Sequence, residues 1–554
     1  MAPLQVHIKH AGKVHDLTLN PDLPGLAFKE DIYQKTGVPV DRMKVMVKGG
    51  MLKDDSEWKK IGPKEGQTFM VIGTAGELPK PPEKPMVFLE DMDEADLAQA
   101  LALPVGLANL GNTCYMNSTV QAMRAIPELQ VALNNASHMQ QPLARSLRDL
   151  YLNMSKTTSS VMPLAFLQIL RQVVPQFAER SGGSKGGMNM AGFAQQDAEE
   201  CWTQVTNALK DVPGLPTPSG SEPGNFVQQF MTGRMRRELK CDEAADEPAT
   251  VSTENVLKLE CNINATTNYM ASGIMDALDQ KVEKQSPSLG RQAVYTQRSR
   301  LERLPQYLAV HMVRFTWKQD ISAKAKILRK VKFPTEFDAL DLTTEELRNH
   351  LGPANRRLME IEKDRAERRK VRRRTKTNAE TLQRENRERQ GGDIEMADAQ
   401  PREPSGTSAA DTEERDAALN VEELAHSEVA AREKEKAELQ KLVDIKLRED
   451  VGASQTGLYD LVAIITHKGA AADSGHYMAF VKKSVFDEKE NPVVQDASSS
   501  GSSPETFSDS VDEDWYKFDD DKVSVFPAAK LTTLDGGGED SSAYVLLYRS
   551  KPPA

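Results

Sequence analysis

The alternation of hydrophobic and polar positions in the first 76 residues predicts a small sheet packed against one helix. Leu4, Val6 and Ile8 occupy every second position, which is typical of a strand with one buried face. A helical pattern follows and stops at Gly37 and Pro39, residue types that commonly end helices. The predicted elements are strands at 4–8, 15–19, 44–47 and 68–72 and a helix at 26–36. Their order predicts a β-grasp fold for residues 1–76.

Beyond this unit the periodicity of the chain changes from helical to strand-like. Leu308, Val310 and Met312 share one face of the strongest predicted strand. Helices followed by strands indicate a domain of the α+β class. The segments are a Pro-rich, acidic linker at 77–100, mainly helices at 101–220 and mainly strands at 225–350.

Two later segments are too polar to bury a core of their own. Residues 353–447 are intensely charged, and we expect lone helices with i, i+4 charge pairs in parts of them. Residues 484–514 are acidic and serine-rich, and they interrupt two predicted strands. We therefore predict a single domain at 101–554 that carries both segments as largely disordered insertions.

Charge, cysteine content and apolar patterning argue against a nucleic-acid-binding, a disulfide-rich or a membrane protein. The net charge of −11 argues against nucleic acid as the main partner. The basic stretch 368–376 resembles a nuclear-import or nucleic-acid patch, but we favour the basic part of a solvated helix. Four cysteines form no disulfide framework, and neither an apolar signal core nor a run of about 18 apolar residues is present. We expect a protein of the cytoplasm and nucleus with no membrane association.

Cys114 is the most informative residue, because it follows a Gly-Asn turn where a helix is predicted to begin. Apolar residues recur from Met116 to Ile126 at helical spacing, and Pro127 is a stop signal. A cysteine thiol is mostly protonated at neutral pH, and a helix N-terminus or a histidine partner favours its nucleophilic thiolate. Burial as a structural cysteine is the commoner fate, so the nucleophile hypothesis depends on a base elsewhere.

His476 is the best candidate base among the nine histidines. It begins a predicted strand after Gly475, whose missing side chain lets a thin substrate backbone pass close to the imidazole. His467 ends the preceding strand and is predicted to be structural. A third group must orient the imidazole, and three acids follow an aromatic-rich strand downstream. Asp519 is our choice, with Asp520 as the alternative.

Five motifs stand out along the chain: Gly-Leu-Ala-Asn-Leu-Gly-Asn-Thr-Cys-Tyr-Met-Asn around Cys114, Gln-Gln-Asp-Ala-Glu-Glu at 195–200, Arg-Phe at 314–315, Ser-Gly-His-Tyr at 474–477 and Trp-Tyr-Lys-Phe-Asp at 515–519. They resemble the boxes of the ubiquitin-specific proteases and occur in the order of that family. Residues 1–76, with Lys-Val-Met-Val-Lys-Gly-Gly before Leu52, resemble ubiquitin and its integral ubiquitin-like relatives. A ubiquitin-like domain joined to such a protease resembles the proteasome-associated branch.

The resemblance implies a papain-like thumb and palm with strand "fingers" that cradle ubiquitin. It implies that Cys114 attacks the carbonyl of ubiquitin's terminal glycine, with His476 as base and then acid and Asp519 orienting it. Asn109 would stabilise the oxyanion together with the backbone N–H of Cys114. The residues implied to bind the ubiquitin tail are Gln196, Asp197, Phe315, Gly475 and Tyr477.

The finger region departs from the zinc-binding pattern of many relatives. Those relatives carry two Cys-x-x-Cys pairs, whereas this region has only Cys241 and Cys261. Four soft ligands are needed for a structural zinc site. We predict no metal, and we expect no cofactor.

The resemblance also implies partners and control. Residues 1–76 would dock on the regulatory particle of the 26S proteasome, with Met46 and Val71 near the position of ubiquitin's apolar patch. Loops near 318–330 and 469–474 would cover the tail channel until docking.

Two other hypotheses belong to different functional classes. One is a non-catalytic ubiquitin-binding adaptor that regulates the proteasome by occupancy, and the intact candidate residues argue for the enzyme instead. The other makes the charged insertion the functional core, as a nucleic-acid or chaperone tether.

Overall fold

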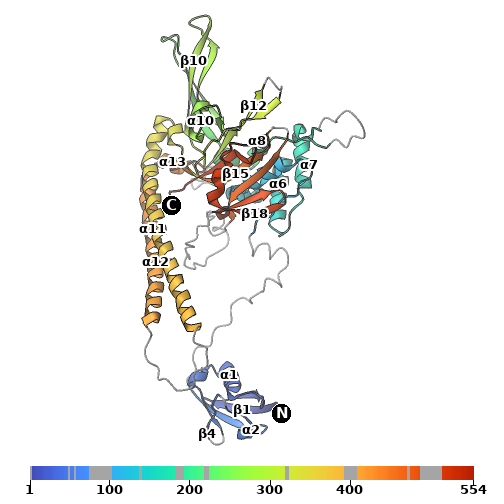
Figure 1. Ribbon diagram of the computed structural model, residues 1–554, viewed down its shortest axis with the longest axis vertical. Helices are drawn as coiled ribbons and strands as arrows, with labels where there is room; N and C mark the ends of the chain where they lie inside the picture. The colour runs from blue at the N-terminus through green and yellow to red at the C-terminus, as the bar shows by residue number, and fades with distance from the viewer. Residues whose placement is uncertain are drawn as a thin grey trace. The chain divides into compact units, whose positions relative to one another are not determined.

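The chain forms two compact units, Met1–Asp91 and Met92–Ala554, each with a hydrophobic core of its own (Figure 1). The predicted linker at 77–100 and residues 487–513 of the predicted second insertion lie outside the described residues. None of the helices described in this computed structural model is long and apolar enough to cross a membrane. The structure describes residues 3–553 apart from 48–49, 55, 57, 74–102, 137–139, 181–191, 217–223, 319–322, 392–408, 471–473 and 487–513.

The first unit has the predicted β-grasp arrangement. Its five-stranded sheet has the order β2-β1-β5-β3-β4, and β1 and β5 run parallel. The rings of Phe28, Trp58 and Phe69 meet edge to face in the core between α1, α2 and the sheet. The elements are β1 (Leu4–His10), β2 (Lys13–Leu19), α1 (Gly25–Thr36), β3 (Lys44–Val47), β4 (Gly50–Met51), α2 (Trp58–Ile61) and β5 (Thr68–Ile72).

The second unit is built on an eight-stranded sheet with both faces buried. Leu308, Val310 and Met312 of β11 pack on one side of this sheet, as predicted, and Tyr307 and Ala309 pack in the core on the other side. The path is β18-β17-β16-β15-β19-β11-β8, with β14 paired to β15. The strands are β8 (Leu259–Asn262), β11 (Tyr307–Val313), β14 (Glu336–Asp338), β15 (Leu458–Lys468), β16 (His476–Lys482), β17 (Trp515–Asp519), β18 (Lys522–Phe526) and β19 (Ser542–Ser550).

A helical layer covers one face of this sheet. The helix that begins at Cys114 ends at Met123, and Pro127 opens the next helix rather than only stopping the first. Proline suits the first turn of a helix because its missing N–H would have no helical partner there. The helices are α4 (Cys114–Met123), α5 (Pro127–Asn135), α6 (Pro142–Met154), α7 (Leu164–Val173), α8 (Ala198–Ala208) and α9 (Phe226–Phe230).

A four-stranded sheet of order β7-β6-β10-β9 projects away from the main sheet as the predicted fingers (Figure 1). At its tip, the Glu247 carboxylate accepts hydrogen bonds from the Ser286 and Tyr295 hydroxyls, both at 2.6 Å. Cys241 packs beneath Tyr295, whereas Cys261 lies on β8 of the other sheet. A polar clasp therefore closes the fingertip. The elements are β6 (Gly233–Cys241), β7 (Thr250–Val256), α10 (Met270–Leu278), β9 (Asp279–Gln285) and β10 (Gln292–Arg303).

The two ends of the charged insertion form helices that pair with each other. We expected lone helices and disorder there, so the structure differs from the prediction. Helix α11 (Glu345–Gly391) lies beside α12 (Ala409–Leu442), and α13 (Ile445–Glu449) follows (Figure 1). Glu428 of α12 is buried and pairs with Arg368 at 2.7 Å and Arg372 at 2.6 Å. Two arginines of the basic stretch therefore hold the helix pair together.

Candidate active site

Cys114 is the first residue of α4, as the turn before it predicts. All ten residues of α4 are buried, because the helix packs between α8 and β16. Cys114 itself is only 2% exposed. The sulfur therefore lies where the N-terminal end of a helix meets the start of a strand, in a partly dehydrated environment that strengthens electrostatic effects.

Two N–H donors point at the Cys114 sulfur. The side-chain amide of Gln195 lies 3.3 Å from Sγ, and the backbone N–H of Tyr477 lies 3.5 Å from it. Donors aimed at a sulfur favour its anionic form over its neutral form. The arrangement therefore suits a nucleophilic thiolate.

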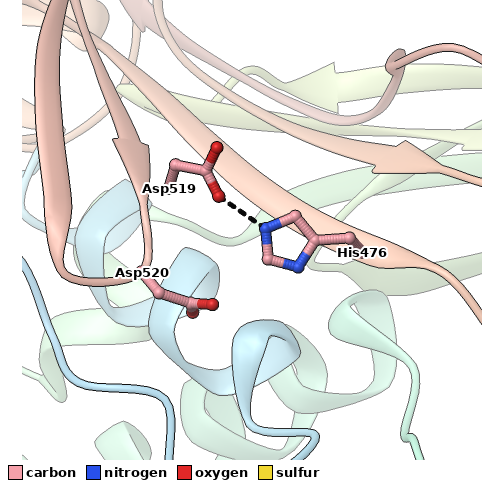
Figure 2. A group of neighbouring side chains, drawn as sticks. All are labelled: His476, Asp519 and Asp520. Carbon is pink, nitrogen blue, oxygen red and sulfur yellow. Dashed lines mark hydrogen bonds and ion pairs between the residues drawn. The ribbon is translucent and has the colours of Figure 1, made fainter.

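His476 opens β16, and Asp519 ends the neighbouring strand β17. Figure 2 shows the imidazole directed at Asp519, whose carboxylate lies 2.6 Å from Nε2. The hydrogen bond with Cys114 and the bond to Asp519 together outweigh burial and raise the pKa of His476 to about 9. Burial alone would raise the pKa of Asp519, but hydrogen bonds from His476 and Lys517 hold it below its ordinary value. The pair therefore favours an imidazolium next to the thiol.

Asp520 lies beside this pair (Figure 2). Its carboxylate accepts hydrogen bonds from the side-chain amides of Asn109 and Asn117, both at 2.8 Å. Its carbonyl accepts the backbone N–H of Leu107, and its φ of +52° is rare for a residue other than glycine. Asp520 thus joins the cysteine segment to the β17–β18 turn and holds the Asn109 amide near the site.

His476, Asp519 and Asp520 are also the sole cluster of possible metal ligands found among the described residues. One ligand atom of each lies within 4.8 Å of the others. Asp519 is bonded to His476, and Asp520 accepts hydrogen bonds from two side-chain amides.

Asp197 caps the N-terminus of α8 and lines an acidic cavity of about 370 Å³. One of its carboxylate oxygens accepts the Glu199 backbone N–H at 2.7 Å and the other accepts the Tyr544 hydroxyl at 2.6 Å. Phe315 lines the same cavity and meets the Tyr544 ring edge on. Two of the predicted tail-binding residues therefore share one negatively charged hollow, whose other lining acids are Glu199 and Glu200.

Two of the other predicted tail-binding residues, Gln196 and Tyr477, have buried side chains. The Gln196 side chain is buried, and it is Gln195 that contacts Cys114. The Tyr477 side chain is also buried, so that only its backbone N–H faces the sulfur. The double-glutamine motif pointed to this place in the chain, but the sequence alone could not show which of the two amides faces the site.

Gly475 is required by its close contact with the preceding strand. Its φ is +139°, and a Cβ there would lie 2.4 Å from the Lys468 carbonyl oxygen and 2.5 Å from the His467 ring. His467 is fully buried between the rings of Phe315 and Tyr477, and burial lowers its pKa to about 4. A neutral, packed His467 thus supports the turn that presents His476.

Two protein-family models match this chain. The family model described as ubiquitin carboxyl-terminal hydrolase matches residues 105–548, and the model of the ubiquitin family matches residues 6–76. Ubiquitin carboxyl-terminal hydrolase 6 of Schizosaccharomyces pombe is 39% identical over 549 residues, which is 99% of each chain. Ubiquitin carboxyl-terminal hydrolase 6 of Arabidopsis thaliana is 36% identical over 99% of this chain and 98% of its own. Ubiquitin carboxyl-terminal hydrolase 14 of Caenorhabditis elegans is 27% identical over 99% of this chain and 93% of its own.

Proposed function

The chain belongs to the ubiquitin carboxyl-terminal hydrolase family and is a cysteine-type deubiquitinase with an N-terminal ubiquitin-like domain, and we propose that Cys114, His476 and Asp519 carry its reaction. The observation that supports these three residues most is the 2.6 Å bond between His476 and Asp519 beside a thiol that two N–H groups approach.

The proposed reaction has two stages. The Cys114 thiolate attacks the carbonyl carbon of ubiquitin's last glycine, and the carbonyl electron pair moves onto its oxygen. As the tetrahedral intermediate collapses, His476 gives its proton to the leaving amine, and a thioester remains. A water molecule then attacks the thioester while His476 takes its proton, and the thiolate leaves.

Asn109 is the proposed side-chain donor to the oxyanion. Asn109 is an exposed residue, and its side-chain amide donates to the Asp520 carboxylate at 2.8 Å. A donor that is already oriented costs little reorganisation when charge develops on the substrate oxygen. The Gln196 and Tyr477 side chains are not proposed to bind the ubiquitin tail, because both are buried. Asp197, Phe315 and the backbone at Gly475 keep that proposed role.

We further propose that the ubiquitin-like domain docks the enzyme on the regulatory particle of the 26S proteasome. Its outer sheet face exposes Met46, Met70 and Ile72. Val71 was expected on this surface, but it is 3% exposed, because alternation along β5 turns it into the core. We also propose that the activity belongs to the cytoplasm and nucleus, because a working thiol suits a reducing compartment.

We also propose that two loops, near 318–330 and 469–474, cover the channel for the ubiquitin tail until the enzyme docks. The hairpin of β12 (Phe315–Lys318) and β13 (Ala323–Lys326) is tied to the turn after β15 through Lys326. The Lys326 backbone N–H donates to the Ala470 carbonyl at 3.1 Å, and its ammonium donates to the His467 carbonyl at 2.8 Å. These bonds support a joint movement of the two loops. Equal hydrolysis of a fluorogenic ubiquitin substrate by free and proteasome-bound enzyme would disprove this control.

The enzyme and the adaptor hypothesis are separated by labelling with ubiquitin that carries a C-terminal electrophile. We expect the proteasome-bound wild-type chain to form a covalent adduct at Cys114 and the Cys114→Ala variant to form none. The matched control is Cys241→Ala, since Cys241 packs in the fingertip. Absence of an adduct on Cys114, with and without proteasome, would contradict the enzyme and favour the adaptor over it.

The fingertip clasp is expected to influence ubiquitin binding more than chemistry. Glu247→Ala removes the acceptor shared by Ser286 and Tyr295, so the tip loses order where the fingers are proposed to hold ubiquitin. We expect KM for a ubiquitin substrate to rise about two- to fivefold with kcat unchanged. Steady-state kinetics checks this, with the exposed Glu283→Ala on neighbouring β9 as the control. A fall in kcat with constant KM would contradict it.

A further inference from the structure

The outer face of the ubiquitin-like sheet carries a row of side chains that crosses all five strands. Strand pairing places Val14 opposite Lys9, Lys9 opposite Met70, Met70 opposite Met46, and Met46 opposite Met51. Neighbouring strands lie about 4.8 Å apart, so the row is about 19 Å long. We call Met46, Met51 and Met70 the methionine row.

The methionine row is unusually open to solvent. Met46, Met51 and Met70 are 43%, 56% and 53% exposed. Among the described residues, the two other methionines with exposed side chains are Met162 and Met359, both in the second unit. Met46 stands between its two neighbours on adjacent strands, where opposite side chains touch. Three thioethers thus form one continuous, accessible patch.

The surroundings of the row indicate the kind of surface that fits it. Lys9 lies opposite Met70, at one end of the methionine row, and Lys44 lies opposite Ile72 on the same outer face. Both lysines are exposed. Flexible, polarizable methionines adapt to apolar side chains, and lysines complement carboxylates. The fitting partner is an apolar surface bordered by acidic residues.

We propose that the methionine row is an oxidation site that switches docking off. This inference rests on the docking proposed above. Hydrogen peroxide is the oxidant: a sulfur lone pair attacks one peroxide oxygen, the O–O bond breaks, and the other oxygen leaves as water. The thioether loses two electrons and becomes a sulfoxide, and the peroxide gains them. Methionine sulfoxide reductases reverse the change.

Oxidation changes docking because a sulfoxide is polar. In an apolar interface its oxygen must give up water without a matching donor. We expect docking to weaken about ten- to hundredfold when the row is oxidised. Folding of the domain is retained, since its core is formed by other side chains, among them Phe28, Trp58 and Phe69.

The test uses the full chain with Cys114→Ser, so that the nucleophilic thiol does not consume peroxide. Peptide mass spectrometry follows the oxidation of each methionine, and the Kd for purified 26S proteasome is measured before and after treatment. We expect Kd to rise at least tenfold as the row oxidises and to recover after treatment with reductase. Full oxidation of the row with unchanged Kd overturns the proposal.

Two matched variants assign the effect to the row. Met46→Leu/Met51→Leu/Met70→Leu keeps an apolar row without sulfur, so it is expected to dock before and after peroxide. Met162→Leu/Met359→Leu is expected to lose docking on oxidation as the parent does. Loss of docking by the peroxide-treated triple variant overturns the assignment. Failure of the untreated parent to bind overturns the docking proposal itself, so the two failures are distinguished.

Discussion

The His476→Ala variant is expected to lose about a thousandfold in kcat for hydrolysis of a ubiquitin amide substrate. His476 is the group that would protonate the leaving amine and deprotonate water, and no other histidine is bonded to the Asp519 carboxylate among the described residues. Steady-state kinetics with a fluorogenic substrate measures the loss. His426→Ala, an exposed histidine on α12, is the matched control and should keep full activity.

The pH profile of the wild-type enzyme tests the same role of His476. Cys114 and Asp519 raise the pKa of His476 to about 9, so the imidazolium persists to that pH. Activity that needs this proton is therefore retained through neutral pH and falls as pH rises through about 9. A profile that falls with a midpoint near the ordinary histidine pKa of about 6.5 would contradict the imidazolium.

Removing the two neighbouring carboxylates is expected to have unequal effects. Asp519→Ala deprives His476 of its bonded partner, and we expect kcat to fall about a hundred- to a thousandfold. The alkaline limb of the pH profile should move to lower pH, because the Asp519 bond contributes to the raised pKa of His476.

Asp520→Ala instead releases the Asn109 and Asn117 amides. We expect a smaller loss, about tenfold, because the oxyanion donor is displaced rather than deleted. The alkaline limb should move less than in Asp519→Ala, since Asp520 contributes only through its more distant charge. A larger loss for Asp520→Ala than for Asp519→Ala would assign the orienting role to Asp520.

Sequence reasoning reached the site because its key residues are tied to local rules. A cysteine after a turn at a helix start, a histidine after glycine at a strand start and an acid at a strand end are positions that local patterns define. The structure brings His476 and Asp519 together because β16 and β17 pair, and this pairing joins residues 43 positions apart.

Other features depended on contacts that no local pattern encodes. The choice of Gln195 over Gln196 depends on how the segment before α8 lies against Cys114, and the contact between Asn109 and Asp520 spans 411 positions. The pairing of α11 with α12 depends on ion pairs buried between the two helices. The sequence of each helix, taken alone, is typical of a solvent-exposed helix. Burial of Val71 follows from the alternation along β5, a local rule that the resemblance to ubiquitin's apolar patch contradicts at this position.

The position of β19 in the sheet has a consequence for folding during synthesis on the ribosome. β19 lies between β15 and β11 in the sheet, yet it is formed by Ser542–Ser550, about 430 positions after Cys114. At ribosomal speeds of about 5 to 20 residues per second, the segment around Cys114 emerges roughly 20 to 90 seconds before β19 is made. The neighbouring strand β15 ends at Lys468, so for only the last roughly 4 to 15 seconds of that interval do β11 and β15 both exist with an edge that still lacks β19. The nascent chain is therefore inactive, and it depends on protection from aggregation until its central strand arrives.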